Sequence, residues 1–81
     1  MKKIKPIFSS IWSNKARIDV YFHEQPLEGK HESDRIQLIL TPADGKPRGW
    51  IMNVADATDI IYGLSKAMGM AIEEGVPNRG D

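Results

Sequence analysis

Residues 53–77 read NVADATDIIYGLSKAMGMAIEEGVP, and this stretch decides the fold because it contains a helix start, a helical period and a helix stop. Asn53 is typical of an N-cap, whose side-chain oxygen accepts a hydrogen bond from a free amide of the first turn. Asp56 places negative charge near the positive end of the helix dipole. Gly75 suits the left-handed conformation that ends many helices, and Pro77 prevents continuation. The sequence therefore predicts one long helix from Asn53 to about Gly75.

The apolar side chains of this helix gather on one side. At 100° per residue they span an arc of roughly 140°, which is typical of a helix that buries one face. They are Val54, Ala57, Ile60, Ile61, Leu64, Ala67, Met68, Ala71 and Ile72. Four residues do not fit this simple amphipathic pattern. Tyr62 and Met70 fall outside the arc, and Gly63 and Gly69 each cost about 1 kcal/mol relative to Ala in a helix interior.

Length and composition predict one small domain with a small hydrophobic core. A chain of 81 residues buries only about 60% of its unfolded surface, so its stability is marginal. There is no cysteine and therefore no disulfide to add stability. Association with a second copy is a common way to bury more apolar surface in a chain of this size. We therefore expect a homodimer.

Charge and hydropathy narrow the choice of partner and compartment. Eleven basic and eleven acidic residues cancel, which argues against binding nucleic acid through bulk positive charge. The first residues, MKKIKPIFSSIW, superficially resemble a signal peptide, but Pro6, Ser9 and Ser10 interrupt the apolar run. No stretch approaches the length of a membrane span. We expect a soluble cytoplasmic protein that does not bind membranes.

Three segments have the period-two alternation that is typical of strands with one buried face. They are residues 16–23 (ARIDVYFH), 35–41 (RIQLILT) and 48–53 (RGWIMN). Asp44 and Gly45 form the centre of the turn before the third segment. The first two segments place Ile18, Val20 and Phe22, then Ile36, Leu38 and Leu40, on the side expected to face the helix. In the third, either Trp50 with Met52 or Ile51 alone faces the core, and the pattern does not decide between them.

The predicted fold is therefore α+β, a three-stranded antiparallel meander followed by the helix, which packs on one face of the sheet. Residues 1–15 are predicted to be a partly ordered arm whose Phe8 and Trp12 contact the domain or a partner. A short helix from about Ser9 is the alternative for this arm. Residues 16–76 form the single domain, and residues 77–81 are predicted to be a disordered tail.

The sheet face that the helix does not cover is the best candidate for a binding surface. It mixes aromatic, aliphatic and arginine side chains, and monomers seldom expose such a mixture without a binding role. The candidate binding residues are Arg17, Tyr21, His23, Arg35, Ile39, Arg48 and Trp50. Tyr, Trp and Arg are enriched at protein interfaces, and they also stack and clamp single-stranded nucleic acid. Cover by the N-terminal arm is the structural alternative.

Catalytic and metal-binding motifs are absent. The five serines have no GxSxG context, and the chain contains neither HExxH nor a glycine-rich phosphate loop. His23, Glu24, His31 and Glu32 are of the types that bind metals, but their spacing matches no known metal site. We expect no enzyme, no metal and no cofactor. The predicted function is a protein-interaction or regulatory module that acts as a homodimer, and the alternative is a nucleic-acid-binding module.

Overall fold

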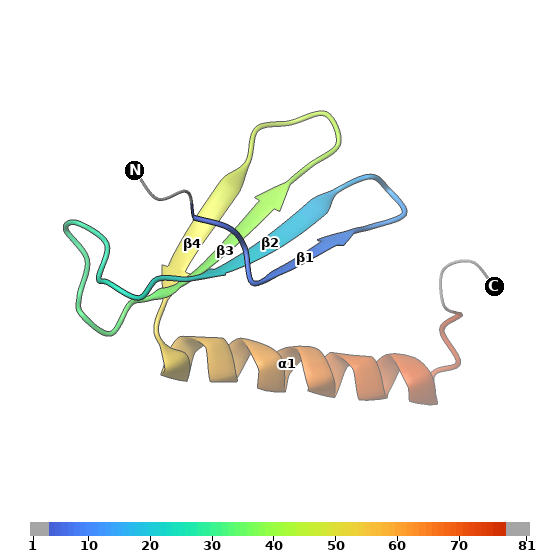
Figure 1. Cartoon of the computed structure of the whole chain (residues 1–81). Coiled ribbons are helices and arrows are strands. Elements are labelled where there is room, and N and C mark those ends of the chain that lie inside the picture. Colours follow the sequence, from blue (N-terminus) through green and yellow to red (C-terminus); the bar gives the residue numbers. More distant parts are fainter. Residues whose placement is uncertain (1–3, 78–81) are drawn as a thin grey trace.

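The computed structural model describes residues 4–77 and contains an antiparallel sheet followed by one helix (Figure 1). The strands follow one another in the sheet in chain order, so the topology is a simple meander. The elements are β1 (Phe8–Ile11), β2 (Arg17–Phe22), β3 (Ile36–Thr41), β4 (Arg48–Met52) and α1 (Val54–Glu73). The α+β class is confirmed. Of the predicted disordered tail, residues 78–81 lie outside the described residues, as do residues 1–3 of the arm.

The prediction of three strands is wrong, because the segment read as an arm contains a fourth, β1. Phe8 pairs with Val20 and Ile11 pairs with Arg17, so β1 is the edge strand beside β2. The alternative of a short helix from Ser9 is also wrong. β1 owes its conformation to backbone pairing with β2, since serine at its centre has little strand propensity of its own.

A tight turn joins β1 to β2 and fixes their register. Trp12 N donates to the carbonyl oxygen of Ala16 at 2.8 Å, and Lys15 N donates to the carbonyl oxygen of Trp12 at 2.9 Å. Lys15 has φ of 70°, the left-handed conformation that a three-residue hairpin loop requires at its last position. Ala16 N also donates to Asn14 Oδ1 at 3.0 Å. The turn is thus held by its own backbone and by one asparagine side chain.

Both ends of α1 follow the sequence signals. Asn53 Oδ1 accepts from Asp56 N at 2.8 Å, and Asp56 Oδ2 accepts from Asn53 N at 3.4 Å, so the two residues form a capping box. Gly75 has φ of 71°, and Val76 N donates to the carbonyl oxygen of Ala71 at 2.9 Å. This is the Schellman pattern that ends helices at a left-handed glycine. The predicted N-cap and helix end are therefore confirmed.

The strand register assigns every strand residue to one of two faces. The face that we call the helix-facing face consists of Phe8, Ser10, Ile18, Val20, Phe22, Ile36, Leu38, Leu40, Arg48, Trp50 and Met52. The opposite face, which we call the helix-free face, consists of Ser9, Ile11, Arg17, Asp19, Tyr21, Gln37, Ile39, Thr41, Gly49 and Ile51. Trp50 pairs with Leu38 and Met52 with Ile36. The choice that the sequence left open is thus settled in favour of Trp50 and Met52.

The helix lies on the helix-facing side of the sheet but does not pack closely against it. Ile60 shares a hollow with Leu38, Trp50 and Met52, whereas no residue of α1 is buried. In Figure 1 the strands rise away from α1, which starts at the end of β4 and extends past the sheet. Among residues 4–77, Ala16 and Met52 are the only buried hydrophobic residues. The single chain therefore has almost no core of its own.

Candidate interaction surfaces

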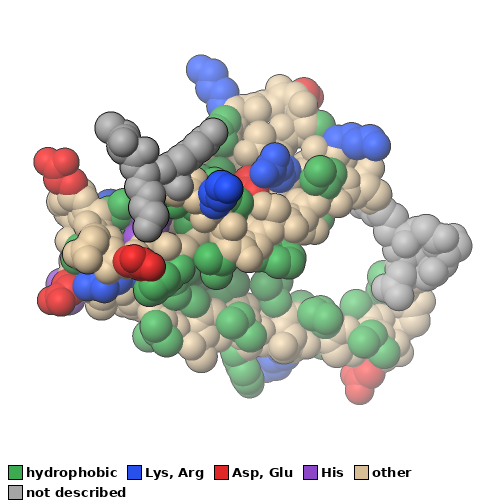
Figure 2. All heavy atoms as spheres, in the orientation of Figure 1, with side chains coloured by type: hydrophobic (Ala, Val, Ile, Leu, Met, Phe, Trp, Pro, Cys, Tyr) green, Lys and Arg blue, Asp and Glu red, His purple; other side chains and the backbone are tan. Residues whose placement is uncertain are grey.

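The first candidate surface is the open wedge, which we define as the space between the helix-facing face and the apolar arc of α1. Two hollows mark its narrow end. One, of about 360 Å³, lies among Leu38, Trp50, Ile51, Met52 and Ile60. The other, of about 570 Å³, is lined by Phe22, Glu32, Ser33, Arg35, Ile36, Asn53, Val54 and Ala55. In Figure 2 hydrophobic side chains line the helix, and the space between helix and sheet is open.

Large apolar side chains on both walls of the open wedge are exposed to solvent. On the helix, Leu64 is 60% exposed and Ile72 is 76% exposed. On the sheet, Phe22 is 52% exposed and Trp50 is 48% exposed. Scattered apolar residues are normal on a protein surface, but here large exposed apolar side chains lie on both walls of the same opening. The open wedge is therefore an incomplete core.

The total surface area of the chain is larger than that expected of a compact domain of the same mass. The chain exposes 7077 Å², whereas a folded monomer of 9.1 kDa is expected to expose about 4,900 Å². The radius of gyration is 15.3 Å, against about 11.7 Å for a compact domain of this length. The excess area is about 2,200 Å². The chain is thus more extended than an independent domain of its size.

The helix-free face has the opposite character, because its polar side chains are paired and partly buried. Asp19 is buried in β2, with Ser9 beside it in β1. Ser9 Oγ donates to Asp19 Oδ1 at 2.5 Å, and Arg17 Nε donates to the same oxygen at 3.0 Å. We call these three residues the Asp19 cluster. The hydrogen bond from Ser9, followed by the hydrogen bond and charge of Arg17, lowers the pKa of Asp19 against the opposing effect of desolvation.

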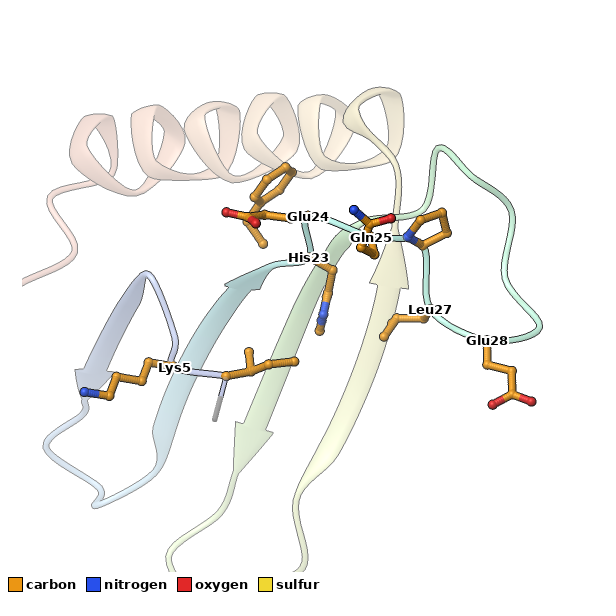
Figure 3. Close-up of a pocket in the computed structure, with 9 residues that line it drawn as sticks. Lys5, His23, Glu24, Gln25, Leu27 and Glu28 are labelled. Carbon is orange, nitrogen blue, oxygen red and sulfur yellow. The ribbon is translucent and has the colours of Figure 1, made fainter. Parts of the chain in front are cut away.

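Two stacked rings lie near the end of β2 and just beyond it. The rings of Tyr21 and His23 have centroids 6.3 Å apart and planes 20° from parallel. His23 is buried, and its Nε2 lies 2.9 Å from Gln37 Oε1. Because the amide oxygen only accepts hydrogen bonds, the ring donates through Nε2. His23 is thereby held in one orientation, and Figure 3 shows it pointing away from α1.

The hollow in Figure 3 lies where β2 ends and the following loop begins. It has a volume of about 450 Å³ and is open to solvent. Its lining residues are Ile4, Lys5, Phe22, His23, Glu24, Gln25, Pro26, Leu27 and Glu28. Its lining combines one lysine, Lys5, with the two glutamates Glu24 and Glu28 of the loop, and Figure 3 shows the Lys5 side chain extending away from them. The mixture of charges and apolar groups does not define a site for one chemical class of ligand.

The structure brings some of the predicted binding residues together and separates others. Arg17, Tyr21 and Ile39 lie on the helix-free face, and His23 extends it beyond the end of β2. Arg35 is engaged elsewhere, because its guanidinium donates to the backbone oxygens of Glu32 and Glu24 at 2.8 and 3.0 Å. It also lies 3.7 Å from the Glu32 carboxylate. Arg35 therefore holds the loop between β2 and β3.

The other two predicted binding residues lie on the opposite side of the sheet. Arg48 pairs with Leu40 and Trp50 pairs with Leu38, so both belong to the helix-facing face. Sequence reasoning missed Ser9, whose role depends on a strand that the sequence did not predict. The sequence did contain a signal for Asp19. It is two residues from Arg17 in a predicted strand, so the two side chains lie on the same face. The pairing of the two could thus have been anticipated.

Among residues 4–77, the histidines and acids that are plentiful in the sequence do not gather into a metal site. His31 Nδ1 lies 2.8 Å from Ser33 Oγ and accepts from Ser33 N at 3.1 Å, so its ring is used within the loop. Within residues 4–77, no three His, Asp or Glu side chains gather in a way that could hold a metal ion. In the same range, no helix is both long enough and apolar enough to cross a membrane.

Comparison of the chain with protein-family models, with curated proteins and with solved structures found no match in any of the three. The function of the protein must therefore be inferred from the two surfaces described above. One is an apolar wedge that a single chain leaves open. The other is a sheet face with ordered polar and aromatic groups.

Proposed function

We propose that this protein is an interaction module that acts as a homodimer, in which a second copy fills the open wedge. The observation that carries the proposal is that α1 has an apolar arc but no buried residue. A 20-residue helix with such an arc is stable in proteins mainly through packing of its apolar face. In the single chain, only the first turns of α1 approach the sheet.

The exposed area agrees with what a stable dimer needs. Obligate homodimers bury about 2,000–5,000 Å² in total, or about 1,000–2,500 Å² from each subunit. The excess surface of this chain is about 2,200 Å², so even half of it reaches the lower end of that range. A dimer interface that buries less area than this range would leave much of the apolar arc of α1 exposed to water.

A second copy is the occupant that fits the wedge best. Both walls are mainly apolar, with Arg48 at the edge strand of the sheet wall. A two-fold axis would let the helix of each chain cover the sheet of the other chain. The charged residues of α1, such as Asp59, Lys66 and Glu73, fall outside the apolar arc. The interface would thus bury the apolar arc of α1 without burying an unpaired charge of the helix. A different protein in the wedge is the competing outcome of the test below.

A matched pair of substitutions tests this proposal. Leu64 and Tyr62 are similarly exposed in the single chain, at 60% and 68%, but only Leu64 belongs to the apolar arc. We expect Leu64→Glu to abolish the dimer and to unfold much of the chain, because a buried unpaired carboxylate costs several kcal/mol. Tyr62→Glu should leave the mass and the melting temperature nearly unchanged. Size-exclusion chromatography with light scattering, together with circular dichroism, measures both.

Equal behaviour of the two variants would contradict the proposal. If both remain dimeric, the interface lies elsewhere. If the wild-type chain is monomeric and folded, the second copy is not needed, and a different protein becomes the candidate occupant of the wedge.

A second candidate function concerns the helix-free face, which the proposed dimer leaves uncovered. The specific observation is that the partly exposed ring of Tyr21, which stacks on the buried ring of His23, lies on the same face as Arg17. Base stacking on such rings and phosphate contacts from arginine are how proteins bind single strands without sequence preference. We propose single-stranded nucleic acid as the partner of this face. Fluorescence anisotropy with a labelled oligothymidine at 20 to 200 mM salt tests it, and no binding at low salt contradicts it.

A further inference from the structure

We infer that Asp19 and Ser9 are positioning residues that hold the Arg17 guanidinium for a backbone phosphate of a single strand. The inference rests on the second candidate function and adds how the phosphate is recognised. It assigns a purpose to an acidic side chain that would otherwise repel the ligand. The inferred phosphate contact is made by Arg17 alone, and Asp19 and Ser9 act through it.

The hydrogen bond to Asp19 fixes one edge of the Arg17 guanidinium. Asp19 Oδ1 accepts from Arg17 Nε at 3.0 Å, which uses one of the five N–H donors of the guanidinium. In the described part of the chain, the structure gives Arg17 no other side-chain hydrogen bond. The four remaining donors belong to the two terminal nitrogens. These nitrogens form the flat fork that binds phosphate through two parallel hydrogen bonds.

The exposure of the two partners fits this division of roles. The side chain of Arg17 is 52% exposed, whereas that of Asp19 is only 10% exposed. The carboxylate is therefore shielded from a ligand by its neighbours, while the guanidinium reaches solvent. Ser9 completes the arrangement, because its hydroxyl donates to the same oxygen and fixes the carboxylate from the β1 side.

Immobilising the arginine in advance improves binding. A free arginine side chain loses rotamer freedom when it binds, at a cost of about 0.5–1.5 kcal/mol per side chain. Arg17 has already lost part of that freedom to Asp19. Tyr21 lies on the same face of β2 as Arg17 and is partly exposed. A nucleic-acid strand with a base stacked on Tyr21 would therefore run along this face towards Arg17.

Substitution of Asp19 separates positioning from simple charge. Removing a negative charge from a nucleic-acid surface should tighten binding if charge alone matters. If Asp19 positions Arg17, the same change should weaken binding despite the more favourable charge. We expect Asp19→Asn to lower affinity for oligothymidine by about threefold and Asp19→Ala by about tenfold, since the amide retains one acceptor.

Arg17 and its control complete the series. Arg17→Lys keeps the charge but lacks the fork, so it should bind nearly as weakly as Arg17→Ala. Arg17→Ala should reduce the slope of log affinity against log salt by about 0.7, the value for one lost phosphate contact on a single strand, whereas Arg17→Lys retains the charge and should leave the slope nearly unchanged. Lys66→Ala, on the polar side of α1, is the matched control and should change neither affinity nor slope.

The outcomes distinguish the inference from the function on which it rests. If the wild-type protein does not bind oligothymidine, the second candidate function fails and the inference fails with it. If the wild type binds and Asp19→Asn binds equally or more tightly, the inference is overturned while the function stands. Should the Asp19 variants fail to fold by circular dichroism, Ser9→Ala decides. It removes one hydroxyl and should weaken binding by about twofold, and unchanged binding overturns the inference.

Discussion

The two faces of the sheet distribute polar and apolar side chains in opposite ways. On the helix-free side, the charged Asp19 and the imidazole of His23 are buried and hydrogen-bonded. On the helix-facing side, Trp50 and the facing helix residue Leu64 remain about half or more exposed. Proteins normally bury apolar side chains such as Trp and Leu more readily than charged or polar ones such as Asp and His. The contrast indicates that the buried polar groups of the helix-free face are satisfied within one chain, whereas the apolar groups of the helix-facing face are left largely exposed.

The largest effect is expected from shortening Trp50. If a second chain covers the open wedge, Trp50→Ala removes a buried aromatic group and should cost about 3 kcal/mol or more. Tyr62→Ala, outside the arc, should cost less than about 0.5 kcal/mol, as surface substitutions do. Urea unfolding at fixed protein concentration measures both. Similar small losses for the two variants would mean that the wedge remains open in solution.

On the helix-free face, acid should reveal the Asp19 cluster. Because the pKa of Asp19 is lowered in the folded chain, its ionised form stabilises the fold. This contribution is fully present above the unfolded pKa of about 3.9 and is lost as the pH falls through the folded value. We expect the free energy of unfolding of Asp19→Asn to fall less steeply than wild type between pH 4 and pH 2. Parallel pH profiles would contradict the described hydrogen bonds.

The turn between β1 and β2 offers a smaller test, in the stabilising direction. Lys15 adopts φ of 70°, which costs a side-chain-bearing residue about 1 kcal/mol relative to glycine. Lys15→Gly should therefore raise the free energy of unfolding by up to about 1 kcal/mol, and Lys15→Val should lower it. Thermal unfolding of the three proteins checks this order. A destabilised glycine variant would show that the turn has another conformation, and that Ser9 is not placed beside Asp19 as described.

The smallest effect concerns the side of α1 that the proposed dimer leaves in solvent. A Cβ at Gly69 would meet nothing within 4 Å, so Gly69→Ala should stabilise the helix by about 0.5–1 kcal/mol. The comparison is with Ala67→Gly in the apolar arc, which should destabilise by more than that amount. A loss of stability in Gly69→Ala would mean that another chain approaches this side, against the placement in the wedge.

How much of this could be predicted from the sequence depended on how local each signal was. The limits of α1 follow from Asn53, Asp56 and Gly75, which act within a few residues of themselves. The strand β1 was missed because its conformation depends on pairing with β2, and Ser9 and Ser10 give no strand signal. The orientation of Trp50 follows from its pairing with Leu38, which the sequence pattern alone does not show.

The candidate surfaces were likewise predictable only where local alternation along a strand defines them. Arg17, Tyr21 and Ile39 were placed together correctly by alternation alone. The loop contacts of Arg35 and the buried position of His23 required the tertiary structure. The open wedge was not expected at all, because amphipathicity shows that a helix face seeks cover without showing which chain provides it.

Sedimentation equilibrium of the wild-type chain over a hundredfold range of concentration tests the proposed dimer most directly. We predict a mass of twice the 9.1 kDa of one chain at micromolar concentration, with the helical signal falling on dilution as the dimer dissociates. A mass of one chain at every concentration, with an unchanged circular dichroism spectrum and cooperative unfolding, would contradict it. In that case the helix and the sheet would be stable with the wedge open to water.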